Sequence, residues 1–390
     1  MAAEVISLGC RLNLSESEDL RDLLPSEPDL VVVNSCAVTG EAVRQTRQAI
    51  RRARSARPDA RLIVTGCAAE VERELLAAMS EVDGLIANSA KLDPRAWNIA
   101  APQVAARSQH TRAFIGVQNG CDHACTFCII PHGRGASRSM AVTDVLKEVE
   151  RHLAAGAREV VLTGVDLTSW GHDLTGSPSL GSLVSTILAA FPDLSRLRLS
   201  SLDGIEIDPV LFELLAGEHR VMPHVHLSLQ HGDDLILKRM KRRHLRQDAM
   251  ALVAALKAAR PEIAIGADLI AGFPTETDTA HAANLSIIRD LAIVHGHVFP
   301  YSVRTNTPAA RMPQVAASTI KARATELREA IARERAAWLQ SLLGQTQQVL
   351  AERDGTGHAP NFARVRLAPQ TQAGTIVTVT PTKVVEGLLE

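Results

Sequence analysis

The sequence predicts an α/β protein built from an N-terminal α/β domain with a parallel sheet, a central partial (βα)6 TIM-like barrel and a small C-terminal β module. Three observations lead to this prediction. Short runs rich in Val and Ile alternate with helical segments over residues 1–100, and a second alternation with six strand candidates fills residues 107–340. Residues 345–390 contain only short strand-like runs separated by turn residues. A chain of 390 residues is long enough for more than one domain.

In the first part, each apolar strand candidate is followed by a polar, helix-like segment. That order is typical of parallel strands joined by helical crossovers. The predicted strands are residues 4–8, 30–33 and 62–65, and the predicted helices are residues 15–24, 40–57 and 70–79. The alternation stops over residues 89–112, which indicates a linker.

In the second part, the strand candidates alternate with helices in the same way. The strands are residues 114–117, 159–163, 196–200, 225–229, 263–270 and 293–299, and the helices fall near 140–155, 178–190, 208–217, 245–259 and 277–290. A long helix rich in alanine and arginine, about residues 315–342, follows them. In a TIM-like barrel the reactive groups lie at the carboxyl ends of the strands, so we expect the site residues there.

The composition is that of a globular protein with a sizeable core, because 46% of the residues are hydrophobic and 22% are charged. No apolar run approaches the roughly 18 residues that a membrane span needs, and the first residues lack a secretory signal pattern. We therefore expect a cytoplasmic protein with no membrane partner. In that reducing compartment, six cysteines indicate metal binding or catalysis and not structural disulfides.

Cys121, Cys125 and Cys128 form a C-x3-C-x2-C loop just after the first predicted barrel strand. Three thiolates on one tight loop can hold three irons of a [4Fe–4S] cluster and leave the fourth iron without a protein ligand. An open iron can bind a small molecule and pass an electron to it. The alternative is a zinc site completed by His123 or His132. Structural zinc sites usually pair two short knuckles, however, and no second knuckle follows.

The other three cysteines, Cys10, Cys36 and Cys67, each follow a predicted parallel strand of the first part. The carboxyl ends of such strands lie at one edge of the sheet, where α/β folds gather their ligands. Residues far apart in the sequence can therefore converge, and a second cluster with an open iron is the favoured interpretation. The alternative is three separate buried cysteines that act as small hydrophobic residues.

The CDHACTFC loop resembles the cluster loop of radical S-adenosylmethionine enzymes, and two further segments fit that superfamily. LTGVDLTSWG resembles the glycine-bearing end of the second barrel strand, and IGADLIAGFPTET resembles the fifth-strand motif that approaches the cofactor's adenine. The resemblance implies that S-adenosylmethionine binds the open iron and is cleaved to a 5′-deoxyadenosyl radical. It also implies cofactor contacts from Gly164, Val165, Asp166, Ser228, Gln230 and Gly272.

With the N-terminal cysteines and the C-terminal module, these motifs resemble the methylthiotransferase family. The resemblance implies two [4Fe–4S] clusters, an auxiliary one on Cys10, Cys36 and Cys67 and a radical one on Cys121, Cys125 and Cys128. RLRLSSLDG, HLSLQHGDDLILKRMKRRH and HVFPYS are most similar to the branch that adds a methylthio group to C2 of N6-threonylcarbamoyladenosine at position 37 of tRNA. One alternative is the same chemistry on isopentenyladenosine of tRNA or on an aspartate of a ribosomal protein. The other is a non-catalytic, metal-containing RNA-binding protein.

The implied partners are the tRNA anticodon loop, an electron donor such as flavodoxin or ferredoxin, and a sulfur source; residues 345–390 resemble a TRAM-like RNA-binding module. The formal net charge of −1 does not itself indicate nucleic-acid binding, so basic side chains must cluster locally. Two candidate groups are a helical stripe and a run at the barrel mouth, with a solvated surface as the alternative for each. They are Arg44, Arg47, Arg51 and Arg54, and Lys238, Arg239, Lys241, Arg242 and Arg243.

Overall fold

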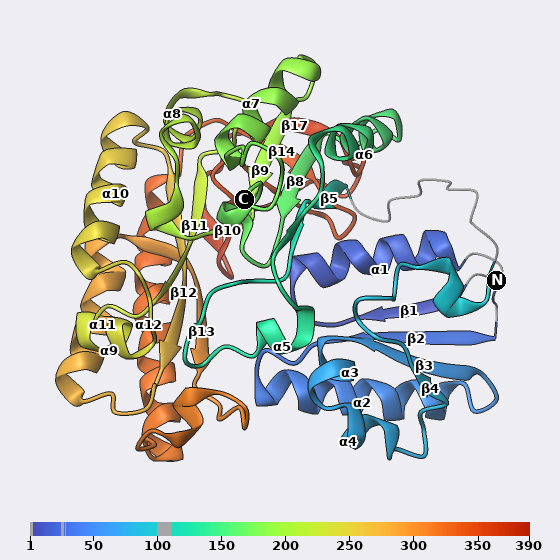
Figure 1. The fold of residues 1–390 in the computed structure, drawn as a ribbon. Coiled ribbons are helices and arrows are strands. Elements are labelled where there is room, and N and C mark those ends of the chain that lie inside the picture. The colour runs from blue at the N-terminus through green and yellow to red at the C-terminus, as the bar shows by residue number, and fades with distance from the viewer. Residues whose placement is uncertain (1–2, 25–26, 28, 100–110) are drawn as a thin grey trace.

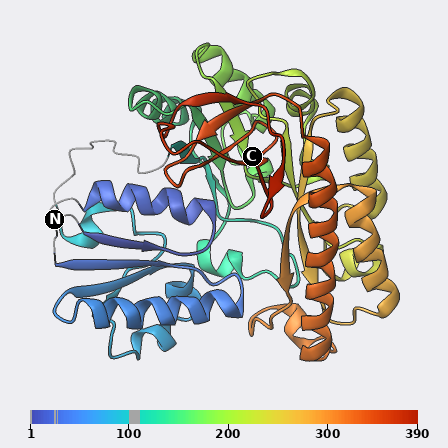
Figure 2. The same ribbon diagram turned by 180° about the vertical axis from the view of Figure 1, so that it is seen from behind.

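A computed structural model describes residues 3–24, 27, 29–99 and 111–390. Figure 1 shows the N-terminal sheet with its helices beside a larger unit of barrel strands and outer helices, with α5 (Ile130–Arg134) between them. The C-terminal strands lie against the barrel strands, as both views show (Figures 1 and 2). The predicted α/β fold is therefore confirmed. Within the described part of the chain, no helix has the length and apolarity of a membrane span.

The N-terminal sheet has four parallel strands in the order β1-β2-β3-β4. Leu20 of α1 packs with Val32 on one face, and Ile50 of α2 packs with Val33 on the other. Because helices cover both faces, every residue of β2 is buried. The strands are β1 (Glu4–Ser7), β2 (Leu30–Ser35), β3 (Arg61–Gly66) and β4 (Gly84–Leu85), and the helices are α1 (Arg11–Leu23), α2 (Gly40–Ala56), α3 (Cys67–Val71) and α4 (Arg73–Ala77).

The prediction of one helix over residues 70–79 is wrong. Two short helices, α3 and α4, meet at Glu72, whose backbone (φ −118°, ψ 33°) interrupts the helix. The predicted linker contains a short 3₁₀ helix, η1 (Pro94–Trp97), and its residues 100–110 lie outside the described residues.

The barrel strands are parallel and form an open arc of two sheets, β5-β8-β9 and β10-β11-β12-β13. β9 and β10 are one strand interrupted at Ser200, since β9 pairs with β8 and β10 pairs with β11. All six predicted strands are present. Their bounds are β5 (Arg112–Gly116), β8 (Glu159–Thr163), β9 (Arg196–Leu199), β10 (Ser201–Leu202), β11 (His224–Gln230), β12 (Ala264–Ala271) and β13 (Ile293–Pro300).

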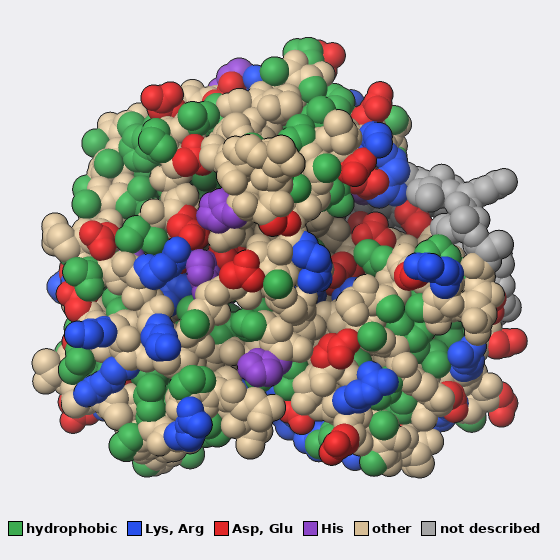
Figure 3. Space-filling model, viewed as in Figure 1, with side chains coloured by type: hydrophobic (Ala, Val, Ile, Leu, Met, Phe, Trp, Pro, Cys, Tyr) green, Lys and Arg blue, Asp and Glu red, His purple; other side chains and the backbone are tan. Residues whose placement is uncertain are grey.

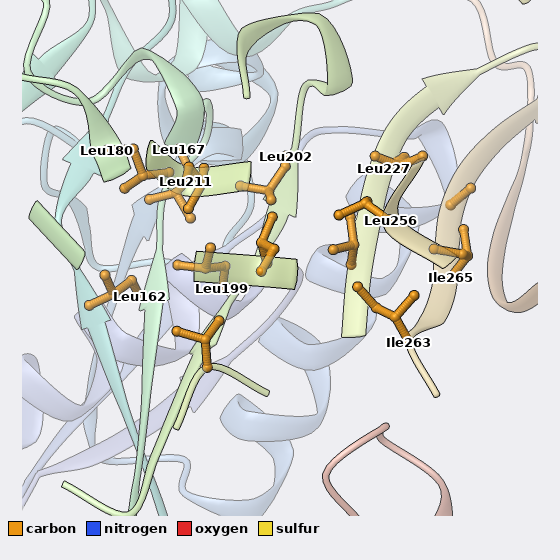
Figure 4. Packing of buried hydrophobic residues seen from close by; sticks show 14 of the residues in the cluster. Leu162, Leu167, Leu180, Leu199, Leu202, Leu211, Leu227, Leu256, Ile263 and Ile265 are labelled. Carbon is orange, nitrogen blue, oxygen red and sulfur yellow. The ribbon is translucent and has the colours of Figure 1, made fainter. Parts of the chain in front are cut away.

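Helices cover the outside of this arc, and their apolar faces meet the strands in one large core (Figure 4). Leu202 and Leu227 of the strands lie close to Leu211 and Leu256 of the helices. The helices are α6 (Val142–Ala154), α7 (Leu180–Ala190), α8 (Pro209–Gly217), α9 (Asp234–Arg239), α10 (Arg246–Ala259) and α11 (Asp278–Asp290). Of these, only α9 has no counterpart among the predicted helices.

The predicted long helix is α12 (Ala317–Ser341), which packs along the outside of the barrel (Figure 2). It leads to a six-stranded sheet in the order β17-β14-β15-β16-β19-β18. Arg196 and Arg198, at the start of β9, donate hydrogen bonds to backbone carbonyls of this sheet, so it covers the amino ends of the barrel strands. Its strands are β14 (Gln347–Ala351), β15 (Thr356–His358), β16 (Arg364–Arg366), β17 (Ile376–Val379), β18 (Val384–Val385) and β19 (Leu388–Leu389).

Candidate functional site

All six cysteines line one cavity of about 300 Å³. The cavity lies where the carboxyl edge of the N-terminal sheet faces the carboxyl ends of the barrel strands. Cys10, Cys36 and Cys67 come from the first side, and Cys121, Cys125 and Cys128 from the second. A larger groove of about 1030 Å³ lies at the other end of the barrel, and no cysteine lines it among the described residues. The cysteine cavity is therefore the candidate site.

Tight backbone turns bring the three N-terminal cysteines together. Gly9 (φ +92°) lies so close to Cys36 that a Cβ there would be 2.7 Å from its Sγ. Gly66 (φ +88°) precedes Cys67 in the same way, and a Cβ there would be 2.4 Å from the Ser35 carbonyl oxygen. Only glycine adopts such backbone angles without strain and allows this approach. The convergence predicted from the strand ends is thus built with the help of the glycines before Cys10 and Cys67.

The other three cysteines lie on the loop between the hairpin strand β6 (Gln118–Asn119) and α5. The loop is held at several points: the Cys121 amide donates to the Gly135 carbonyl at 3.1 Å, and the Thr126 amide donates to the Met240 carbonyl at 3.1 Å. Backbone amides of His123 and Ile130 point at the sulfurs of Cys121 and Cys128, each at 3.4 Å.

All six cysteines are free thiols in the structure. Burial, with a contribution from Asp166, raises the pKa of Cys121 to about 12, and burial raises the pKa of Cys128 to about 12. The thiolate is the form of cysteine that binds iron, so a cluster bound here would take the place of these protons. Two sets of three soft sulfur ligands with amide donors toward sulfur fit iron–sulfur clusters.

The zinc alternative fits the geometry less well. Cys121, His123 and Asp166 place ligand atoms within 4.8 Å of one another, but this group contains only one of the three loop cysteines. His123 Nε2 lies 2.8 Å from the Asp166 carboxylate, so in this structure that nitrogen contacts a carboxylate and not a cysteine sulfur. His132 does not line the cavity.

Five of the six predicted cofactor-binding residues line the cavity: Gly164, Val165, Asp166, Ser228 and Gln230. Gly272 does not. Its backbone (φ +71°) packs against α12, where a Cβ would be 2.5 Å from Ile320, so this glycine serves helix packing. Asp268 and Ile270, earlier in the same predicted motif, line the cavity in its place.

The sequence did not indicate how the residues of two polar groups in the site come together. Arg243 joins Asp203 and Glu206 beside His123, with an Arg243 to Glu206 distance of 2.7 Å. In the second group, His226 and His297 both contact the same oxygen of Asp268, at 2.9 and 3.0 Å. HVH on β11 and HGH on β13 supply these histidines, but only the pairing of the strands brings them together.

The stripe of arginines on α2 carries more acidic partners than the sequence suggested. Arg44 pairs with Glu41 at 2.7 Å, Arg51 with Glu81 at 3.6 Å and Arg54 with Asp83 at 2.5 Å. On the face in Figure 3, Lys and Arg side chains likewise lie among Asp and Glu side chains. Of the stripe, Arg47 alone has no ion pair among the described residues.

The run at the barrel mouth divides into two kinds of residue. Lys238 and Lys241 are exposed. Arg239 donates to Thr275, and Arg242 is nearly buried and pairs with Asp203 at 2.9 Å. Arg242 and Arg243 therefore hold the site together, whereas the two lysines remain available to a partner.

The fold and the cysteine cavity are those of a radical S-adenosylmethionine protein. The family model described as the radical SAM superfamily matches residues 115–284, and that of an uncharacterised protein family, UPF0004, matches residues 2–87. The structure of the radical S-adenosylmethionine methyltransferase TsrM from Kitasatospora setae has the same fold, with a TM-score of 0.53 and 17% identity over 73% of this chain and 64% of that chain.

Curated relatives define the family more narrowly. The chain is 42% identical to the threonylcarbamoyladenosine tRNA methylthiotransferase MtaB of Rickettsia prowazekii, over 99% of this chain and 96% of the relative. It is 34% identical to MtaB of Chlamydia pneumoniae (93% and 90%) and 32% identical to the tRNA-2-methylthio-N(6)-dimethylallyladenosine synthase of Novosphingobium aromaticivorans (96% and 93%). The chain therefore belongs to the radical SAM methylthiotransferase family. This membership implies S-adenosylmethionine and a [4Fe–4S] cluster, and suggests a second cluster.

Proposed function

We propose that the protein transfers a methylthio group to C2 of N6-threonylcarbamoyladenosine at position 37 of tRNA, giving the 2-methylthio derivative. The observation that carries the proposal is that two sets of three cysteines face one cavity from opposite sides. Two clusters, each with an open coordination position, would then face the same enclosed space. This arrangement suits the transfer of a sulfur group from one cluster to a substrate activated at the other cluster.

The cysteine assignments follow from position. Cys10, Cys36 and Cys67 hold the auxiliary [4Fe–4S] cluster, and Cys121, Cys125 and Cys128 hold the radical cluster. When bound, the radical cluster and S-adenosylmethionine supply the one-electron chemistry that an unactivated adenine C2–H bond requires. In this proposal the auxiliary-cluster domain spans residues 1–100, the radical domain spans residues 107–340, and the RNA-binding domain spans residues 345–390.

Other side chains shape the cavity for the cofactor and the substrate. Gly164, Val165 and Asp166 form one wall, and the Asp166 carboxylate is fixed by Ser169 Oγ at 2.7 Å and by His123. Ser228 and Gln230 form another wall and offer polar groups to the cofactor. Fixed side chains of this kind hold reacting groups in position without further ordering.

The similarity to named relatives favours the threonylcarbamoyl substrate, because the relative with that activity in its name is more similar than the dimethylallyladenosine synthase. Of the two predicted basic groups, Lys238, Lys241 and Arg47 make no ion pair or side-chain hydrogen bond among the described residues, so we expect them to contact tRNA phosphates. A low-potential electron donor, such as flavodoxin or ferredoxin, and a sulfur source complete the proposed set of partners.

Two cysteine variants test the assignment of the clusters. Anaerobically reconstituted enzyme should hold about eight irons, and Cys36→Ala and Cys125→Ala should each hold about four. Cys125→Ala should form no 5′-deoxyadenosine from S-adenosylmethionine, whereas Cys36→Ala should form it and yet give no methylthio product. Each variant thus serves as the control for the other. Methylthiolation by Cys36→Ala would contradict the auxiliary site, and mass spectrometry of tRNA nucleosides from a deletion strain would identify the substrate.

A further inference from the structure

Three charged side chains form a buried ion network behind the cysteine cavity. Lys91 Nζ lies 2.6 Å from Glu16 Oε2, and Arg134 contacts both oxygens of Glu16, at 2.9 and 3.0 Å. All three side chains are buried: Lys91 is only 2% exposed, Glu16 5% and Arg134 1%. Glu16 is on α1, Arg134 on α5, and Lys91 lies between β4 and η1. The network therefore joins the N-terminal sheet unit to the loop that carries Cys121, Cys125 and Cys128.

The network carries more positive than negative charge. Burial by itself raises the pKa of Glu16, but Lys91 and Arg134 lower it below its ordinary value, so the carboxylate is ionised. Burial lowers the pKa of Lys91, but its contact with the ionised Glu16 favours the charged form, so two cations face one anion. The remaining polar contacts of Lys91 and Arg134 are with neutral side chains, Asn34 for the lysine and Asn13 and Asn119 for the arginine.

The other ionisable groups that line a cavity with Lys91 and Arg134 do not remove the excess. They are Glu70 and Arg138, which have opposite charges, and the exposed His132. Arg138 is exposed and Glu70 is half-buried, so solvent screens both. An uncompensated buried cation strongly destabilises the folded state, so a stable fold requires an anion close to it.

The three N-terminal cysteines are the groups that can supply this anion. Arg134 lines the cavity beside Cys10, Cys36 and Cys67. Lys91 lines a neighbouring cavity together with Gly133 and Arg134. The backbone before Arg134 also touches Cys67, because a Cβ on Gly133 would be 3.3 Å from the Cys67 Cβ. An oxidised [4Fe–4S] cluster with three thiolate ligands carries a single net negative charge, equal and opposite to the excess.

We propose that the positive charge of Lys91 and Arg134 in excess of Glu16 is the counter-charge of the auxiliary [4Fe–4S] cluster and sets its reduction potential. The inference rests on the proposed function, since it requires a cluster on Cys10, Cys36 and Cys67. Reduction adds a negative charge to the cluster, and a nearby buried cation favours that charge because the low dielectric strengthens the attraction. Lys91 and Arg134 are positioning residues in this role, and neither needs to contact a substrate.

Redox titration of the full-length chain tests the charge effect. In a background with Cys121, Cys125 and Cys128 replaced by alanine, only the auxiliary cluster can form, and its midpoint potential is measured by electron paramagnetic resonance. Lys91→Met should lower the potential, and Glu16→Gln, which removes the anion, should raise it. Lys257→Met is the matched control, because Lys257 lies on α10 away from the cavity, and it should leave the potential unchanged.

The opposite signs separate a charge effect from structural damage, which would not shift the potential up in one variant and down in the other. Unchanged potentials in a normally loaded cluster, or shifts of the same sign, would overturn the inference and leave the proposed function intact. A background protein without iron would overturn both. If Lys91→Met folds but loses its iron, Glu16→Gln decides alone: a raised potential supports the counter-charge, and an unchanged one refutes it.

Discussion

The side chain of Arg242 links the cysteine loop to the barrel strands. It donates to the Asp203 carboxylate at 2.9 Å and to the Ser228 carbonyl at 2.8 Å, and it lies 3.8 Å from Cys125 Sγ. Its side chain is 8% exposed, whereas the adjacent Lys241 is exposed. Two basic neighbours in one sequence run therefore have different roles, one inside the site and one on the surface.

This difference gives a prediction for each residue. Arg242→Met should destabilise the protein by about 2–3 kcal/mol, because it leaves a buried carboxylate with weaker hydrogen bonding. Lys241→Met should change stability by less than about 0.5 kcal/mol. If the lysine contacts a phosphate, Lys241→Met should also weaken tRNA binding. It should then reduce the slope of log affinity against log salt concentration by about 1. Thermal unfolding measures the change in stability, and tRNA binding at several salt concentrations measures the change in affinity and in its salt dependence. Equal changes in Arg242→Met and Lys241→Met would contradict the assignment of different roles.

At the level of elements, the cysteine loop depends on how closely its two ends approach. Gly120, just before Cys121, has φ +76°, and a Cβ there would be 1.9 Å from the Ala136 carbonyl oxygen. The antiparallel pairing of β6 with β7 (Arg138–Ser139) fixes that approach. Gln118 donates to the Gly120 carbonyl at 2.8 Å and accepts from the Asp166 amide at 2.9 Å, which ties the loop to the end of β8.

Replacement of Gly120 therefore tests the geometry of the loop. Gly120→Ala forces the backbones apart, so we expect it to lose about four irons and the ability to cleave S-adenosylmethionine. Gly156→Ala is the matched control, since Gly156 has φ +92° and a Cβ there would meet nothing within 4 Å. It should cost only about 1–2 kcal/mol of backbone strain and retain full iron. Full iron content in Gly120→Ala would show that the loop can relax.

At the scale of the whole molecule, the C-terminal sheet closes the end of the barrel opposite the cysteine cavity. The Phe362 ring is stacked on His358 at 4.6 Å and lies 4.9 Å from His224 at the start of β11. The guanidinium of Arg198 lies 4.8 Å from the same ring and pairs with the buried Glu159 at 2.8 Å. Aromatic and cation–π contacts thus anchor the proposed RNA-binding domain at the amino ends of the barrel strands.

Histidines in this interface predict a pH dependence of stability. Burial, with a contribution from Arg335, lowers the pKa of His295 to about 3, and burial lowers the pKa of His224 well below its ordinary value. The folded state therefore binds fewer protons than the unfolded state below about pH 6.5, and stability is lost as the pH falls through this range. The loss from His295 alone reaches about 2 kcal/mol at pH 5.

Unfolding midpoints between pH 7.5 and 5 measure this loss. His295→Phe keeps an aromatic ring beside Trp338 and Phe362 but cannot be protonated, so its midpoint should fall less on acidification than that of the wild type. His219→Gln is the control, because His219 is 88% exposed, and it should follow the wild type. Parallel curves for His295→Phe and the wild type would refute the assignment.

The sequence alone determined the architecture and the six cysteines of the site. Strand and helix periodicity are local properties, and the C-x3-C-x2-C spacing is contained in one loop, so both are readable without a structure. The three N-terminal cysteines were also predictable, because parallel strands place their carboxyl ends at one edge. The interruption at Glu72 was not, since nothing in residues 70–79 marks it.

Only the tertiary structure decided which partners the polar residues have. Lys91 and Arg134 meet Glu16 across 75 and 118 residues of sequence, and Arg242 meets Asp203 across 39. Gly272 matched a cofactor motif, yet the approach of α12 determines its role. Ion pairs and close packing depend on which surfaces the complete fold brings together, and no local pattern carries that information.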